Sequence, residues 1–88
     1  MQVRISKQVA DYVRSLPPFQ KRRIRAALKG LESLQGDLKD LQHPLEGYCR
    51  LRAFQFRLIL KINLTTVDCI FIEKRPIVYE AFEQMMLR

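Results

Sequence analysis

The sequence predicts an α+β fold: an N-terminal strand, a helical hairpin, an antiparallel three-to-four-stranded sheet and a short C-terminal helix. Three observations predict it. Two stretches with helical periodicity meet at Pro17-Pro18, three stretches with strand character follow one another over residues 48–74, and Pro76 precedes a last amphipathic segment. The chain has 88 residues, enough for one modest core, and we expect a single domain over residues 1–88.

The first five residues alternate between apolar and polar side chains, with Met1, Val3 and Ile5 on one side, which predicts a short strand. Ser6 can then cap a helix. The apolar stripe of that helix consists of Val9, Tyr12, Val13 and Leu16. Pro17-Pro18 ends this helix and can begin the next one, because proline is tolerated in a first helical turn.

A second helix is predicted over residues 18–34. Its apolar face consists of Ile24, Ala27, Leu28, Leu31 and Leu34, and its cations are Lys21, Arg22, Arg23, Arg25 and Lys29. These cations have three interpretations: contact with RNA phosphates, contact with an acidic protein, or a solvated face. Residues 36–47 contain Gly, Asp and Pro and are predicted to form a loop that Leu38, Leu41 and Leu45 anchor to the core.

Three strands are predicted over residues 48–53, 55–64 and 67–74, and Pro76 begins the final helix. The third strand is almost entirely apolar, which suits a central strand covered on both faces. Alternation puts Arg50, Arg52 and Arg57 on the same face of the sheet if the apolar side chains meet the helices. We therefore expect these guanidinium groups to point together into an open face.

The net charge of the chain narrows the class of its binding partner. Sixteen Lys and Arg against nine Asp and Glu give a formal charge of +7, so the natural partner is nucleic acid or an acidic protein. No stretch approaches the roughly 20 apolar residues of a membrane span. The N-terminus lacks the apolar core of a signal peptide, and we expect a cytoplasmic protein with no membrane partner.

Metal and cofactor sites are not expected. Cys49 and Cys69 lie in apolar strand patterns, without a CxxC motif or a nearby histidine cluster. They are interpreted as buried thiols, with a disulfide between neighbouring strands as the open alternative. His43, the only histidine, lies in the predicted loop and is interpreted as a residue without a catalytic role.

The arginines suggest phosphate chemistry. Arg50, Arg52 and Arg57, with Arg75 at the end of the last strand, could clamp a polyphosphate and stabilise a pentacovalent phosphorane during RNA cleavage. Tyr79 could stack on a base or bond a ribose hydroxyl. The 2′-hydroxyl of RNA can itself attack the adjacent phosphate. The plainer alternative is that these arginines are edge charges or salt-bridge partners.

The chain resembles the RelE/ParE superfamily of bacterial type II toxins over essentially its whole length. The matching motifs, in order, are LxG at residues 45–47, RLR at 50–52, FRLIL at 56–60 and KRxxVY at 74–79, preceded by the first strand and the helical hairpin. The resemblance implies a RelE/ParE-like (microbial RNase-like) fold. It also implies a ribosome-dependent mRNA endonuclease that inhibits translation and leaves a 2′,3′-cyclic phosphate and a 5′-hydroxyl.

The resemblance also implies roles for individual residues. Arg57 matches the phosphate-stabilising arginine, Arg75 the arginine linked to transition-state charge and the leaving oxygen, and Tyr79 the tyrosine that orients the nucleotide. The full expected site is Arg57, Arg75, Tyr79 and Arg50 as catalytic residues, and Arg52, Tyr48, Lys61 and Lys74 as RNA-binding residues.

Two departures from the family pattern bear on activity. Arg50 and Tyr48 stand where RelE carries lysines, and an arginine cannot lose a proton as a general base must. Lys61 and Lys74 are strand neighbours that could take over this role. The usual glycine before the middle strand is also replaced, in the segment AFQF, so we expect a different hairpin turn.

Two other functions fit the same resemblance: a ParE-like inhibitor of DNA gyrase, and a catalytically decayed toxin that only binds its antitoxin. In every case the implied partner is a cognate antitoxin protein, with operator DNA bound only through that antitoxin. The endonuclease interpretation adds the ribosome and its mRNA as partners.

Overall fold

The computed structural model describes residues 1–86 and confirms the predicted α+β class. The strands are β1 (Gln2–Ile5), β2 (Asp37–Asp40), β3 (Cys49–Ala53), β4 (Phe56–Ile62) and β5 (Thr66–Lys74). The helices are α1 (Lys7–Ser15), α2 (Pro18–Gly30), a 3-10 turn (Leu31–Ser33) and α3 (Val78–Met86). None of the helices in residues 1–86 has the length and apolar character that crossing a membrane requires.

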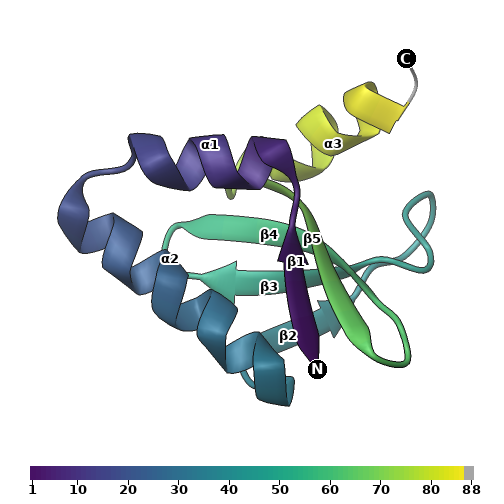
Figure 1. Ribbon diagram of the computed structural model, residues 1–88. Helices are drawn as coiled ribbons and strands as arrows, with labels where there is room; N and C mark the ends of the chain where they lie inside the picture. The colour runs from purple at the N-terminus through teal and green to yellow at the C-terminus, as the bar shows by residue number, and fades with distance from the viewer. Residues whose placement is uncertain (87–88) are drawn as a thin grey trace.

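All five strands form one sheet in the order β1-β5-β4-β3-β2. The pairs from β2 to β5 are antiparallel, whereas β1 runs parallel to β5. Figure 1 shows α1 and α2 meeting at a sharp corner on one side of this sheet, and α3 leaving from the end of β5. The apolar strand β5 is an interior strand between β1 and β4, as its composition predicts, with α1 and α3 both packed against it.

The sheet separates two apolar clusters. The larger cluster joins α1 and α2 to the sheet through side chains such as Val9, Ile24 and Leu58, all of which are fully buried. The smaller cluster joins α3 and the segment before β3 to the opposite face, through Leu45, Ile59, Phe71, Val78 and Phe82. Because α3 covers only part of that second face, the rest of it is left for polar side chains.

Ser6, the N-cap of α1, and Gln8 within α1 fasten the helix to the edge of β5 that faces β1. The Ser6 backbone N–H donates to the Cys69 carbonyl (2.9 Å). The Ser6 hydroxyl donates to the Ile70 carbonyl (2.7 Å) and accepts the Val9 N–H, which caps α1 as predicted. Beyond the end of β1, the Gln8 side-chain amide bonds both the N–H and the carbonyl of Ile72, at 2.9 and 2.8 Å. The Gln8 amide thus continues the row of hydrogen bonds that β1 makes along β5.

The middle of the chain differs from the sequence prediction at two places. The second helix ends at Gly30 rather than at residue 34, and Leu34 takes a left-handed backbone with φ +52°, so its side chain is exposed instead of completing the apolar face. The segment predicted as a loop over 36–47 contains strand β2, so the antiparallel part of the sheet has four strands, the upper number of the predicted three to four.

The remaining boundaries shift by one or two residues, as strand and helix ends commonly do. The final helix begins at Val78, two residues after Pro76.

The two cysteines, Cys49 on β3 and Cys69 on β5, are both free. Strand β4 lies between them, and its residue Leu60 is the cross-strand partner of both. A whole strand therefore separates the two thiols, which excludes the disulfide alternative in this fold.

Candidate functional site

A cationic hollow of about 290 Å³ opens on the sheet face that α3 leaves partly uncovered. Its lining consists of Lys39 (β2), Arg50 and Arg52 (β3), Arg57 (β4), Arg75 (after β5) and Tyr79 (α3). We call this site the arginine hollow. Five of its six lining residues are cations, and none is acidic.

Strand register explains why these side chains meet. Lys39 is paired with Arg50 across β2 and β3, and Arg52 is paired with Arg57 across β3 and β4. Paired residues point to the same face of a sheet, so the alternation of β3 brings both pairs onto one side. The neighbouring residues Leu51 and Ala53 point the other way, into the larger core.

Arg75 and Tyr79 close the hollow from the end of β5. The Arg75 backbone N–H donates to the Gln55 carbonyl (3.1 Å), which ties the chain after β5 to the turn between β3 and β4. Tyr79 is the second residue of α3, and its side chain lines the hollow. The buried side chains of Val78 and Phe82 hold that first turn of α3 against the sheet and so fix the position of the phenol ring.

Arg57 is the one buried charged residue in the described part of the chain, with an exposed fraction of 6%. Its guanidinium Nη1 donates to the carbonyls of Phe54 (3.1 Å) and Phe56 (2.9 Å). Burial, and then the charges of Arg52 and Arg75, lower the pKa of Arg57 below its ordinary value. Arginine still remains protonated at neutral pH. Arg57 is therefore a positive charge surrounded by other positive charges, and it forms no ion pair with any of residues 1–86.

Arg50 is the cation of the hollow that has an acidic partner. Its Nη1 donates to the Asp37 carboxylate (3.1 Å) and to the Asp37 backbone carbonyl (2.9 Å). Arg52, Arg57 and Arg75 form no ion pair with any residue that the structure describes. The hollow therefore keeps most of its positive charge available for a ligand.

The structure brings together five of the eight predicted site residues: Arg50, Arg52, Arg57, Arg75 and Tyr79. Tyr48 lies outside the hollow; its ring packs edge-on against Phe82 with centroids 5.2 Å apart. Lys61, paired with Asp68 near the far end of β4, and Lys74, the last residue of β5, also do not line it. Tyr48 instead lines a larger hollow, of about 560 Å³, together with the carboxylate residue Asp40.

Lys39 is the lining residue that sequence reasoning missed, because its segment was assigned to a loop. The segment DLKD offers a single apolar residue, and aspartate and lysine are both uncommon in strands. The available signal was the alternation itself, since Leu38 points into the larger core while Asp37 and Lys39 point away from it.

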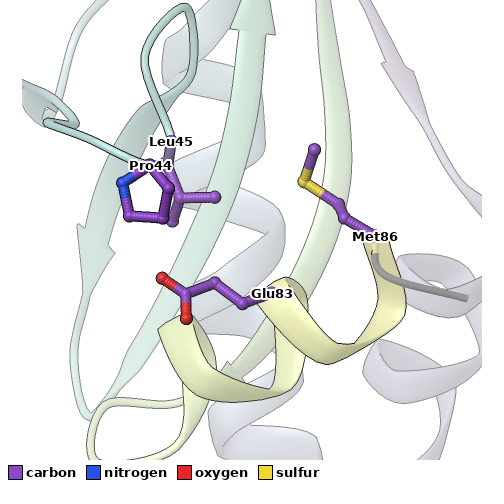
Figure 2. A pocket seen from close by; sticks show the side chains of 4 residues that line it. All are labelled: Pro44, Leu45, Glu83 and Met86. Carbon is purple, nitrogen blue, oxygen red and sulfur yellow. The ribbon is translucent and has the colours of Figure 1, made fainter.

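A third hollow, of about 240 Å³, has the wrong chemistry for phosphate. Figure 2 shows Glu83 and Met86 of α3 facing Pro44 and Leu45 of the loop before β3. Its lining is apolar apart from one carboxylate, which would repel an anion. Among residues 1–86, no group of three His, Cys, Asp or Glu side chains could hold a metal ion.

The arginine hollow can bind a phosphodiester and stabilise extra charge on it. Guanidinium groups form bidentate bonds to phosphate, and several of them around one phosphorus stabilise the dianionic phosphorane better than the monoanionic substrate. Lys39 and Tyr79 are the lining groups that can lose a proton, because the other four are arginines. The hollow thus contains both electrostatic groups and candidates for proton transfer.

Comparison with known proteins identifies the fold. No protein-family model and no curated protein matches the sequence. Among solved structures, a chain of the RelBE2 toxin–antitoxin complex from Mycobacterium tuberculosis is similar, with a TM-score of 0.71 and 25% identity over 84% of this chain and 96% of that one. A chain of the RelB-RelE antitoxin–toxin complex from Methanococcus jannaschii gives a TM-score of 0.69 and 18% identity, covering 90% and 98% of the two chains.

A YoeB/ParE toxin from Agrobacterium tumefaciens shares the fold at lower similarity, with a TM-score of 0.60 and 13% identity over 85% of this chain and 99% of that one. All three matches span nearly the full length of the solved chains. The overall fold, and not an isolated motif, therefore carries the similarity.

Proposed function

Given that this chain belongs to the RelE/ParE superfamily of toxins, we propose that it is the toxin of a type II toxin–antitoxin system and cleaves mRNA on the ribosome. The observation that carries the proposal is the arginine hollow, in which Arg57, Arg75 and Tyr79 meet without an acidic lining residue. A site of this composition suits a ribose-phosphate backbone.

The reaction is an internal transfer at phosphorus. The 2′-hydroxyl of one nucleotide attacks the adjacent phosphate, the bond from phosphorus to the 5′-oxygen breaks, and the products carry a 2′,3′-cyclic phosphate and a 5′-hydroxyl. Arg52, Arg57 and Arg75 stabilise the negative charge that accumulates on the phosphate oxygens. Lys39 and Tyr79 are our candidates for taking the 2′-hydroxyl proton and supplying one to the leaving oxygen.

The electrostatics of Arg57 support this assignment. Burial and neighbouring charges lower its pKa, so the folded protein holds this cation at a cost in stability. A bound phosphate replaces the missing counter-charge and is therefore held more tightly than it would be by the same number of exposed, separate arginines.

The proposed protein partner is a cognate antitoxin, because the similar M. tuberculosis and M. jannaschii chains come from toxin–antitoxin complexes. With a formal charge of +7, this chain favours an acidic antitoxin segment. An acidic segment over the arginine hollow would exclude RNA from it.

Primer extension on translating ribosomes tests the enzymatic proposal. Wild-type protein should produce defined cuts within messages, and Arg57→Ala, Arg75→Ala and Tyr79→Phe should each reduce cutting, with losses of about 10²–10³ for the arginines. Arg14→Ala is the matched control, since Arg14 is an exposed cation on α1 that bonds Asp11. Absence of cuts with wild type, or equal cutting by Arg57→Ala and Arg14→Ala, would count decisively against the proposal.

A second candidate is a ParE-like inhibitor of DNA gyrase, favoured by the similarity to the A. tumefaciens toxin and by the lack of lysine at positions 48 and 50. It predicts inhibition of DNA supercoiling while messages stay intact. A catalytically decayed toxin instead predicts antitoxin binding without growth arrest. Supercoiling, message integrity and growth, measured on the same preparation, separate the three possibilities.

A further inference from the structure

Two exposed phenyl rings enclose an arginine where the start of α2 meets the turn between β3 and β4. Phe19 and Phe54 are 56% and 48% exposed, and their ring centroids lie 6.5 Å apart in an edge-on arrangement. The Arg23 guanidinium carbon lies 4.7 Å from the centroid of Phe54 and 5.6 Å from that of Phe19. We call these three residues the Phe-Arg-Phe cluster.

Phe54 occupies a backbone position that disfavours it. Phe54 and Gln55 form the two-residue turn between the paired residues Ala53 and Phe56, and Phe54 has φ +62°. Glycine and asparagine take this conformation readily, whereas a bulky side chain there is strained. The Phe54 ring lies outside both apolar clusters of the core, so folding does not explain why it is there. A strained residue with an exposed apolar ring indicates a role in binding.

The cluster is directly connected to the arginine hollow. The carbonyl of Phe54 accepts a hydrogen bond from the Arg57 guanidinium, while its ring lies against Arg23 of α2. One residue therefore joins the rim of the hollow to the α2 surface. That surface is cationic as well: α2 carries Lys21, Arg22, Arg25 and Lys29 besides Arg23, and no acidic residue.

We propose that the Phe-Arg-Phe cluster is a stacking site for an unpaired base of single-stranded RNA whose backbone continues from the arginine hollow over the turn between β3 and β4. Every base has a π-face that stacks on phenyl rings or on a guanidinium plane, and the flanking phosphates can contact the cations of α2. An acidic peptide could pair with Arg23, but it would leave both rings without a function. The inference rests on the proposed function in one respect, which is that the ligand is RNA.

The chain contains no tryptophan, so Phe54→Trp introduces a single fluorescent reporter into the cluster. The probe is a 2′-O-methyl oligoadenylate of about eight nucleotides, a length within the range that single-stranded binding surfaces cover and resistant to 2′-hydroxyl attack. Base stacking should quench the tryptophan as the probe binds. A probe that carries only abasic sugars should bind more weakly and leave the fluorescence unchanged.

Affinities of ring-deletion variants for the same probe measure the contribution of stacking. Phe54→Asn, whose new side chain suits the left-handed backbone, and Phe19→Ala should each weaken binding about 5- to 150-fold, as expected for the loss of one stacked base. The matched control is Leu64→Asn, which removes an apolar side chain that is 98% exposed at the opposite end of β4. Melting temperatures of all variants should show that each is folded.

Equal probe affinity of folded Phe54→Asn, Leu64→Asn and wild type would overturn the stacking site, as would an equal loss with the abasic probe. Loss of antitoxin binding with RNA affinity unchanged would assign the cluster to a protein partner and also overturn it. The proposed function fails separately: if the probe quenches Phe54→Trp and ribosomes show no message cleavage, the stacking site stands and the enzymatic proposal does not.

Discussion

Reversing one charge in the arginine hollow should stabilise the protein. Arg52 lies directly opposite Arg57 in the sheet, both face the hollow, and neither forms an ion pair with a residue that the structure describes. Like charges that face each other across two strands are destabilising, and opposite charges are stabilising, by about 0.2–1 kcal/mol each. Arg52→Glu exchanges the first for the second. It also places a carboxylate opposite Asp37, the other cross-strand neighbour of Arg52, but Asp37 is more exposed than Arg57 and already pairs with Arg50. We therefore expect a net gain of about 0.2–1 kcal/mol after the lower strand propensity of glutamate is subtracted.

Thermal unfolding followed by circular dichroism measures this gain. For a chain of this length, 1 kcal/mol corresponds to about 4–8 °C, so Arg52→Glu should raise the Tm by about 1–8 °C at low ionic strength. The gain should shrink in 1 M salt, where the Debye length falls to about 3 Å. The same variant should lose RNA binding, because it places a carboxylate in the hollow.

Arg14→Glu is the matched control. Arg14 already bonds Asp11 at 3.0 Å, so reversing its charge should lower the Tm slightly instead of raising it. The reasoning would be refuted if Arg52→Glu melted below wild type at low salt, or if its Tm difference did not depend on salt. Either result would mean that the cations of the hollow are not held against mutual repulsion.

Three further outcomes are expected. Burial, with a hydrogen bond to the Glu73 carboxylate, raises the pKa of Tyr12 to about 12. The folded state therefore keeps a proton that the unfolded chain loses near pH 10, and the free energy of unfolding measured in urea should fall between about pH 10 and 12. This fall should be smaller in Tyr12→Phe. Burial raises the pKa of Cys49 to about 11 and of Cys69 to about 12, so alkylation followed by mass spectrometry at neutral pH should modify both slowly until urea unfolds the chain. Gly36→Ala should lower the free energy of unfolding in urea by about 1–3 kcal/mol, because φ is +133° and the new Cβ would lie 2.7 Å from the Leu51 side chain. Gly47→Ala should cost less, because Gly47 has φ +90° but no atom within 4 Å of its new Cβ. Equal costs of the two substitutions would contradict this account.

The sequence predicts the site best where alternation is regular. The pattern of β3 and β4 is strict enough to place Arg50, Arg52 and Arg57 on one face, and the structure has them there. The position of Tyr79 beside them could not follow from alternation, because it depends on how α3 packs on the second apolar cluster. The short distance along the chain from Arg75 to Tyr79 suggested that expectation, and the resemblance to a family added the role of the tyrosine.

The sequence predicts least where short segments depend on their neighbours. Strand β2 has one inward apolar residue, Leu38, and forms because β3 offers it a partner. Leu34 continues the apolar spacing of α2 but lies beyond Gly30, where the helix tightens and ends. Phe54 occupies a turn position that requires a positive φ, and a segment without glycine gives no warning of it.

The parallel pairing of β1 with β5 determines when this protein can complete its fold during synthesis. Residues near the N-terminus find their sheet partners 64 positions later in the chain, as in the bond from Ser6 to Ile70. The helical hairpin can form from local contacts soon after it leaves the ribosome, but β1 must wait until β5 has emerged. Most of this chain must therefore be synthesised before β1 can pair with β5, the strand that leads into Arg75.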